Sequence, residues 1–260
     1  MTRCSKAAVI TGGGTGVGRA ATLRLAQLGY GVVFNYSRSQ SEALDTATEV
    51  TAAGGEAVCL QADVAADEDC RKLIATAEAT FGRLDVLINC AGTTEFIPFH
   101  DLEAVSTELW DRLFRVNVTG AFQCARAAAP LLRRSGGGVI INVSSVAAQL
   151  GQGSSIPYCC SKAALDNLTV SLARTLAPEI RVNGIAPGFI AGRWTERGLG
   201  EKYAAVVSAY EQALPLHKVC QPDDIAQAIV DLATGSPLIT GQTLTVDGGM
   251  LISGFQVKFH

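Results

Sequence analysis

Apolar and polar positions follow two different repeats along this chain. Short runs that are apolar on both faces predict strands, and they fall at 7–11, 31–36, 57–61, 84–89, 139–143, 181–185 and 243–246. Between them, apolar residues recur at three- and four-residue steps. This second repeat predicts helices near 17–28, 41–53, 67–80, 157–177 and 222–233, and either two helices or one broken helix over 106–135.

The alternation of buried strands with helices determines the expected architecture. Strands that are apolar on both faces and separated by helices pair in parallel through right-handed crossovers. We therefore predict an α/β fold with a doubly wound, seven-stranded parallel sheet. A length of 260 residues suits one hydrophobic core, so we expect a single domain over 1–260. In such a sheet, ligands bind beyond the carboxyl ends of the strands.

The segment 188–219 interrupts this alternation between the sixth strand and the last helix. It contains the glycines Gly192, Gly198 and Gly200 and the aromatic residues Trp194, Tyr203 and Tyr210. Glycine hinges and aromatic side chains favour a helical substrate-lid insertion rather than a second domain. The alternative is a pair of surface helices at a subunit interface.

Composition and charge narrow the functional classes. A formal net charge of −3 and the absence of a basic cluster argue against a nucleic-acid or anionic-membrane partner and favour a small-molecule substrate. No run of ~18 apolar residues and no export signal is visible, so we expect a cytoplasmic protein. The 8 cysteines are scattered, which indicates reduced thiols. No metal site is indicated, because the histidines at 100, 217 and 260 fall outside the loops that follow the strands.

A glycine-rich run follows the first strand and opens the first helix. It contains Gly12, Gly14, Thr15, Gly16, Val17 and Gly18. Glycines let the chain turn tightly and bring backbone N–H groups against a pyrophosphate at the positive end of a helix. A tight turn uses glycine without a ligand too, but the position after the first strand favours a dinucleotide site.

The end of the second strand indicates which dinucleotide is preferred. An acidic residue there would accept a hydrogen bond from the ribose 2′-hydroxyl of NAD and repel a 2′-phosphate. Here Ser37, Arg38 and Ser39 offer a guanidinium and two hydroxyls, and no carboxylate occurs before Glu42. We therefore expect NADP(H) to be preferred, with NAD(H) still possible. The alternative is that Arg38 only solvates the start of the next helix.

Tyr158 and Lys162 are candidates for proton transfer. Their i, i+4 spacing places both side chains on one face of a helix. A neighbouring cation would lower the pKa of the phenol from about 10. Such a pair also occurs where a half-buried ring covers a lysine stem. Ser145 lies at the carboxyl end of the fifth strand, where reactive groups are presented, although serines at that position also form turns.

The order and spacing of these motifs resemble the short-chain dehydrogenase/reductase family over nearly the whole chain. The motifs are Gly12-x3-Gly16-x-Gly18, Asp63-Val64, Asn89-Cys90-Ala91-Gly92, Asn117, Ser145, Tyr158-x3-Lys162 and Pro187-Gly188. The resemblance implies a Rossmann-type fold and a hydride transfer between NADP(H) and a carbonyl or alcohol. Cys90 departs from the commoner asparagine, and Ala191-Gly192 stands where a threonine often contacts the cofactor.

The resemblance also implies roles for particular residues. Asn117, Ser145, Tyr158 and Lys162 would form the catalytic tetrad, with Ser145 orienting the substrate oxygen, Tyr158 as general acid or base, and Asn117 kinking a helix and holding a water that links Lys162 to solvent. Lys162 would also bind the nicotinamide ribose. Further cofactor contacts would come from Asp63 and Val64 at the adenine, from Asn89, Ala91 and Gly92 beside the adenosine, and from Pro187, Gly188 and Ile190 at the carboxamide.

Within the family, the cofactor loop and the ending Val246 to Met250 look most like 3-oxoacyl-acyl-carrier-protein reductases. The implied reaction is reduction of a ketone, with 3-oxoacyl groups as one candidate. A sugar or polyol dehydrogenase running toward oxidation and a non-catalytic NADP-sensing protein remain alternatives. An acidic carrier protein would need a basic patch, and only Arg126, Arg133 and Arg134 cluster in sequence. We expect the pocket walls to include Thr93, Thr94, Glu95, Phe96, Gln149, Leu150, Phe189, Trp194 and Tyr203.

Family members of this length usually form homotetramers, and two apolar segments agree with this expectation. One is a wide face formed by Val118, Ala121, Phe122, Ala125, Ala128, Ala129 and Leu132. The other is the tail from Leu251 to His260. We predict that both are covered by neighbouring subunits.

Overall fold

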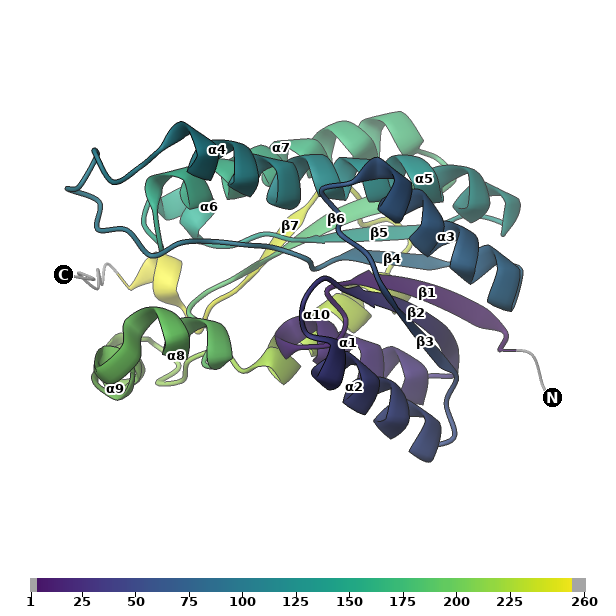
Figure 1. Ribbon diagram of the computed structural model, residues 1–260, viewed down its shortest axis with the longest axis horizontal. Coiled ribbons are helices and arrows are strands. Elements are labelled where there is room, and N and C mark those ends of the chain that lie inside the picture. The colour runs from purple at the N-terminus through teal and green to yellow at the C-terminus, as the bar shows by residue number, and fades with distance from the viewer. Residues whose placement is uncertain (1–3, 254–260) are drawn as a thin grey trace.

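A sheet of seven parallel strands runs through the centre of the protein (Figure 1). The computed structural model describes residues 4–253. The strands are β1 (Lys6–Thr11), β2 (Tyr30–Tyr36), β3 (Ala57–Gln61), β4 (Val86–Asn89), β5 (Gly138–Val143), β6 (Ile180–Pro187) and β7 (Thr243–Val246), in the order β3-β2-β1-β4-β5-β6-β7. The predicted fold class is confirmed, and each predicted strand lies within two residues of its observed bounds.

Helices cover both faces of the sheet. One face carries α1 (Gly16–Gln27), α2 (Gln40–Ala52) and α10 (Pro222–Thr234), and the other carries α3 (Asp67–Phe81), α4 (Thr107–Phe114), α5 (Gly120–Arg134) and α7 (Ile156–Leu176). Neighbouring strand residues point to opposite layers, so Val9 packs in the core beneath α3 and α5 while Ile10 packs beneath α1 and α10. This two-sided burial explains why most strand positions are apolar on both faces of the sheet.

The region 106–135 forms one continuous helical stretch with an irregular middle. Between α4 and α5, the residues Arg115–Thr119 adopt a π-helical turn, labelled η1. A π-turn inserts an extra residue into a helix and is often found at functional sites. The turn includes Asn117, so this residue lies where the helical stretch departs from α-helical geometry.

The apolar face of α5 is used within the subunit, so the prediction that a partner covers it is wrong. Ala121 is buried, and Ala125, Ala128, Ala129 and Leu132 are buried in the core shared with α3 and the sheet. Of the predicted face, Val118 is half-buried, and Phe122 is 41% exposed with the Arg126 guanidinium 5.4 Å from its ring centroid. The tail prediction falls mostly on residues 254–260, which lie outside the described residues.

The segment 188–219 folds into helices beyond the carboxyl ends of the strands (Figure 1). It contains α8 (Arg193–Leu199), a short 3-10 turn η2 (Gly200–Lys202) and α9 (Tyr203–Ala213). Two further short elements, α6 (Ala147–Leu150) and η3 (Met250–Ile252), span too few residues for a periodic pattern to reveal them. Within residues 4–253, no helix is long and apolar enough to cross a membrane.

Candidate active site

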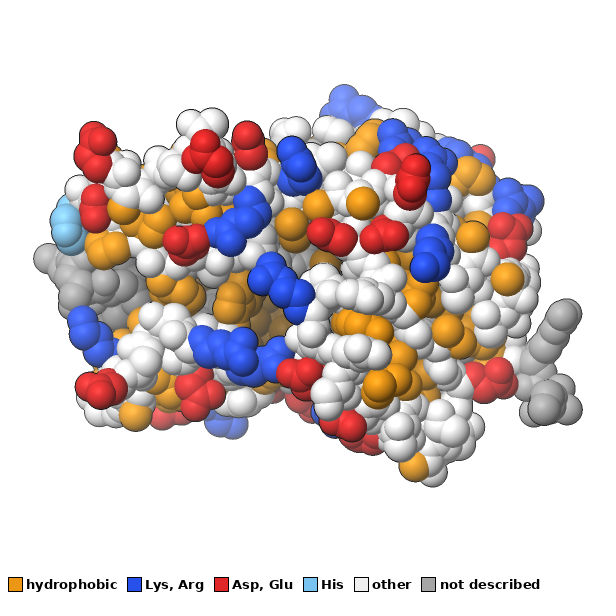
Figure 2. All heavy atoms as spheres, in the orientation of Figure 1, with side chains coloured by type: hydrophobic (Ala, Val, Ile, Leu, Met, Phe, Trp, Pro, Cys, Tyr) orange, Lys and Arg blue, Asp and Glu red, His pale blue; other side chains and the backbone are white. Residues whose placement is uncertain are grey.

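A cleft of about 920 Å³ opens along the carboxyl ends of the strands. Figure 2 shows it as a hollow near the middle of one face, with Lys and Arg side chains gathered at its rim. Most of the predicted site residues line it, namely Gly12, Gly14, Thr15, Gly16, Val17, Gly18, Ser37, Arg38, Ser39, Asp63, Val64, Ala91, Gly92, Ser145, Tyr158, Lys162, Pro187, Gly188 and Ile190. Asn89 and Asn117 are the two predicted residues that do not line the cleft.

The glycine loop at one end of the cleft has no room for a side chain at Gly13 or Gly18. A Cβ added to Gly18 would lie 2.2 Å from the Gly12 carbonyl oxygen, and one added to Gly13 would lie 2.4 Å from Cβ of Phe34. The Asn35 side chain accepts a hydrogen bond of 3.0 Å from the Gly12 N–H and so fixes the turn. The α1 N-terminus has no side-chain cap from its N-cap residue, Thr15. Exposed backbone N–H groups at a helix N-terminus fit a pyrophosphate, so the loop can hold a dinucleotide.

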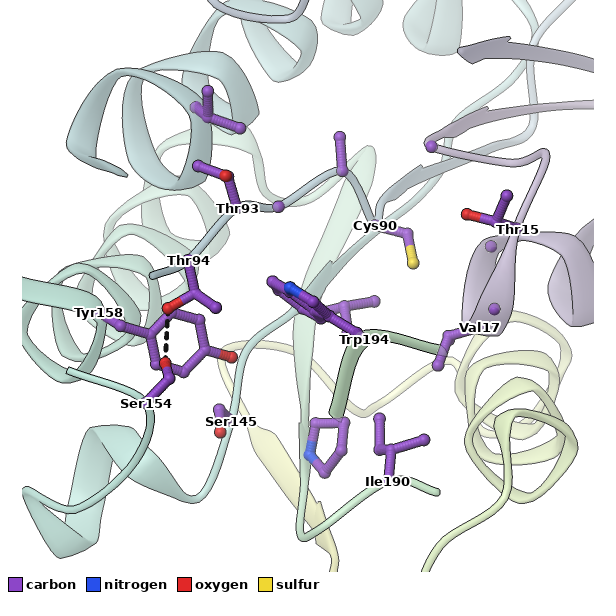
Figure 3. A pocket seen from close by; sticks show the side chains of 18 of the residues that line it. Thr15, Val17, Cys90, Thr93, Thr94, Ser145, Ser154, Tyr158, Ile190 and Trp194 are labelled. Atoms are coloured by element: carbon purple, nitrogen blue, oxygen red, sulfur yellow. Dashed lines mark hydrogen bonds between the residues drawn. The ribbon is translucent and has the colours of Figure 1, made fainter. Parts of the chain in front are cut away.

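Tyr158, Ser145 and Lys162 meet in the middle of the cleft. Ser145 follows β5, and the other two project from α7, one helical turn apart. The phenol of Tyr158 is hydrogen-bonded to the Ser145 side chain, and Lys162 Nζ lies 5.7 Å from the Tyr158 ring centroid. In Figure 3, the Tyr158 and Ser145 hydroxyls face the same cavity. The arrangement brings a proton donor and a second hydroxyl to one point.

Burial controls the pKa values of this group. It raises the pKa of Tyr158 to about 12, and the hydrogen bond to Ser145 offsets only part of that rise. Burial also lowers the pKa of Lys162 to about 8, against smaller raising effects from Cys90 and Asp166. The expected lowering of the phenol pKa by Lys162 is therefore wrong for the protein alone. The physical reason is that desolvation of the buried phenolate outweighs the hydrogen bond with Ser145, while Lys162 Nζ donates to the Val143 carbonyl, 2.8 Å away.

Asn117 and Asn89 brace the elements around the cleft. The Asn117 side chain is 1% exposed; its Oδ1 accepts from the Thr93 N–H at 2.8 Å, and its Nδ2 donates to the Thr93 carbonyl at 3.0 Å and to Ser161 Oγ at 2.9 Å. These bonds join η1 to the loop after β4 and to α7. Asn89 Nδ2 donates to Asn142 Oδ1 at 2.8 Å, which links β4 to β5 beneath the cleft.

Helix α8 covers the cleft opposite the glycine loop. The Trp194 ring stands edge-on to Tyr158, with 6.2 Å between the ring centroids (Figure 3). The backbone at Gly198 packs against the Phe96 ring, because a Cβ there would approach within 2.1 Å of it. Of the predicted pocket walls, Thr93, Thr94, Phe96, Phe189 and Trp194 line the cleft, and Glu95, Gln149, Leu150 and Tyr203 do not.

Arginines at the cleft are the residues that sequence reasoning missed. Besides the predicted Arg38, the lining includes Arg112, Arg115, Arg193 and Arg197. No local motif marks these positions, since they come from η1, α4 and α8. By contrast, the cluster predicted from sequence is neutralised, because Arg126, Arg133 and Arg134 face Asp67, Glu179 and Glu78, respectively.

Cysteine thiols and candidate metal ligands are two further kinds of functional group. All eight cysteines are free thiols. Cys90 lines the cleft, and burial raises the pKa of its thiol to about 11, so it is a neutral group at physiological pH. Across residues 4–253, no group of three or more His, Cys, Asp or Glu side chains is arranged to hold a metal ion.

Comparison with known proteins identifies the family. A family model described as enoyl-(acyl carrier protein) reductase matches residues 12–251. A Streptomyces violaceoruber protein named as a ketoacyl reductase of the granaticin polyketide synthase is 41% identical over 242 residues, covering 93% of this chain and 94% of that protein. The 3-oxoacyl-acyl-carrier-protein reductase of Synechocystis is 38% identical over 251 residues, covering 95% and 98%. The solved structure of a Burkholderia xenovorans protein titled as a short-chain dehydrogenase/reductase has a TM-score of 0.88 at 38% identity and covers 95% of this chain and 98% of its own. The chain therefore belongs to the short-chain dehydrogenase/reductase family of oxidoreductases.

Proposed function

We propose that this protein reduces a ketone to a secondary alcohol with NADPH, and that 3-oxoacyl thioesters are the preferred substrate class. The observation that carries the proposal is the hydrogen-bonded pair of Tyr158 and Ser145, with Lys162 one helical turn away, in a cleft that begins at the glycine loop. The relatives support the substrate class, because they are named ketoacyl and 3-oxoacyl reductases.

The side chains of the cleft suit reduction. A bound nicotinamide would supply the hydride. Tyr158, whose raised pKa of about 12 keeps it protonated at neutral pH, gives its proton to the substrate oxygen, which Ser145 holds in place. Lys162 is mostly cationic below its pKa of about 8, so it stabilises the developing phenolate and binds the ribose hydroxyls. Asn117 acts as a positioning residue through its bonds to Thr93 and Ser161.

NADP(H) is the proposed cofactor, in preference to NAD(H). The tight glycine loop and the open α1 N-terminus suit the pyrophosphate. Arg38 is exposed at the end of β2 and has no ion-pair partner among the described residues, so it is available to a 2′-phosphate flanked by Ser37 and Ser39. The remaining contacts would come from the walls of the cleft: Asp63, Val64, Ala91 and Gly92 on the adenosine side, and Pro187, Gly188 and Ile190 at the carboxamide. Asn89 would support these contacts from below.

The segment 188–219 is proposed to be a substrate lid on a single catalytic domain. Its α8 carries Trp194 directly onto Tyr158, which a surface helix pair with no role at the cleft would not do. Sugar or polyol oxidation is not favoured by the names of the relatives. A non-catalytic NADP sensor would have no need of Ser145, Tyr158 and Lys162 together.

The test follows NADPH absorbance with a panel of substrates. We expect 3-oxoacyl thioesters to be reduced with a higher kcat/KM than simple ketones, and NADPH to be used in preference to NADH. A matched enoyl thioester separates carbonyl reduction from reduction of a carbon–carbon double bond. Faster turnover of the enoyl thioester, or oxidation of sugar alcohols with NADP⁺ as the dominant activity, would overturn the proposal.

We also propose that the protein assembles as a homotetramer with two-fold symmetric interfaces. Exposed apolar side chains away from the cleft support this, including Val170 at 44% and Leu244 at 45% exposed, on α7 and on the edge strand β7. Light scattering at micromolar concentration should return about four times the mass of one chain. A mass near 27.1 kDa would contradict the assembly.

A further inference from the structure

An ion pair joins two segments that are far apart in sequence. Arg193 of α8 pairs with Glu42, in the first turn of α2, and its Nη2 also lies 3.4 Å from Ser39 Oγ. Ser39 is the N-cap residue of α2 and follows Arg38 directly. The lid insertion therefore reaches the segment where the 2′-substituent of the ribose would lie.

The ion pair with Arg193 neutralises the negative charge of Glu42. Glu42 lies in the first turn of α2, three residues after Ser39, and its negative charge would repel a phosphate group bound nearby. Hydrogen bonds and nearby charges lower the pKa of Glu42. The backbone hydrogen bond has the largest effect, the hydrogen bond from the Arg193 side chain the next largest, and the charge of Arg197 the smallest. Glu42 is thus ionised and held by a guanidinium. A negative charge that would oppose a 2′-phosphate is neutralised by a residue of the lid insertion.

The charges around this point fit a phosphate monoester. Arg38, Arg193 and Arg197 all line the cleft, and Glu42 opposes one of them. Two positive charges remain, which matches the roughly −1.5 to −2 charge of a phosphate at neutral pH. Guanidinium groups also present paired donors that suit phosphate oxygens.

We propose that Arg193 is a specificity-determining residue for the cofactor: it masks Glu42 and adds a guanidinium to the 2′-phosphate site, so α8 takes part in choosing NADPH over NADH. The inference rests on the NADPH preference proposed above. It extends that preference from the β2–α2 segment to a residue 151 positions away in sequence.

The test compares two small probes that differ only in the 2′-phosphate. Calorimetry would measure Kd for adenosine 2′,5′-bisphosphate and for 5′-AMP with the native protein, Arg193→Ala and Arg38→Ala. We expect Arg193→Ala to weaken bisphosphate binding by about tenfold or more and to change AMP binding little. Arg115→Ala is the matched control, since it removes one cleft arginine that has no ion-pair partner in residues 4–253. An equal loss of bisphosphate binding in Arg115→Ala would mean that only the overall charge of the cleft matters, and would overturn the proposal.

A double variant tests the masking of Glu42. If Arg193 masks the carboxylate, then adding Glu42→Gln to Arg193→Ala should restore part of the lost bisphosphate affinity, and no recovery would overturn that part of the proposal. If Arg193→Ala weakens both probes equally while Arg38→Ala weakens only the bisphosphate, this inference fails and the NADPH preference stands. If neither variant distinguishes the probes, the NADPH preference itself fails.

Fluorescence provides a readout of α8 itself. The chain has 2 tryptophans, so Trp110→Phe leaves Trp194, the neighbour of Arg193, as the reporter. We expect the bisphosphate to change Trp194 emission more than AMP does, and Arg193→Ala to abolish the difference. Identical responses to both probes in Trp110→Phe would overturn the participation of α8.

Discussion

The two walls of the cleft are built in different ways. On the glycine-loop wall, α1 buries six residues in the core: Val17, Gly18, Ala21, Thr22, Leu25 and Ala26. On the opposite wall, α8 buries none, and α9 buries only Tyr210. The first wall is therefore held by close packing. The second wall packs on a small separate cluster around Phe189, Tyr210 and Leu214. Helix α8 itself is held by a small number of contacts, among them Arg193 with Glu42, Trp194 with Tyr158 and Gly198 with Phe96.

This difference separates the two tasks of the cleft. A wall made of backbone and buried side chains can present N–H groups to phosphate at fixed positions, because moving it would disturb the core. A wall with few buried contacts opens at a low free-energy cost and can admit a substrate. Tyr158 lies where the walls meet, hydrogen-bonded to Ser145 below it and touched by Trp194 from α8.

The largest effect should come from the group at this meeting point. Tyr158→Phe removes the proton donor but keeps the ring that contacts Trp194, so kcat should fall by about 100-fold or more. NADPH affinity, measured by calorimetry, should change little. Turnover close to that of the native protein would contradict the assigned role of Tyr158.

The packed wall should be intolerant of one added methyl group. Gly18→Ala places a Cβ 2.2 Å from the Gly12 carbonyl oxygen, so NADPH affinity should fall more than tenfold and the free energy of unfolding by about 1–3 kcal/mol. Gly54→Ala is the control, since Gly54 has open space around it and only its positive φ, +82°, opposes a side chain. It should cost about 1 kcal/mol and leave NADPH binding intact. Equal loss of binding in both variants would mean that close packing is not what shapes the loop.

The pH profile should report Lys162. Its pKa of about 8 lies below the ordinary value, so the cation is present below that pH and is lost as pH rises through it. For reduction, kcat/KM should be level near pH 7 and decline above about pH 8, approaching tenfold per pH unit. Tyr158, with a pKa of about 12, should add no limb in this range. A profile that stays level to pH 10 would show that reduction does not require the lysine cation.

The smallest effect should come from the loosely held wall. Trp194 is 49% exposed, so Trp194→Ala should barely change Tm. Loss of the contact with Tyr158 should raise KM for the ketone by about threefold to fivefold and leave kcat within twofold. A large drop in Tm would show that α8 is part of the packed structure after all, and the contrast between the walls would be lost.

Local patterns in the sequence determined much of this protein. The strands follow from apolar runs, and their parallel pairing follows from the regular alternation of strands with helices. The glycine loop, Ser145, and Tyr158 with Lys162 could be placed in one cleft because each is a short motif at a strand end or on one helix face. Each of these features depends on residues that are close together in the chain, which is why a single sequence reveals them.

Only the tertiary structure decided which surfaces meet and how well they are desolvated. The apolar side of α5 predicts burial but not the identity of its cover, which is the subunit's own core rather than a partner. The pKa of Tyr158 rises because burial outweighs the hydrogen bond with Ser145, a balance that spacing along the helix does not reveal. Arg193 and Glu42 form no motif, since 151 residues separate them, and they meet because α8 folds back over the start of α2. Contacts of this kind depend on how whole elements pack together, and this packing is a property of the complete fold.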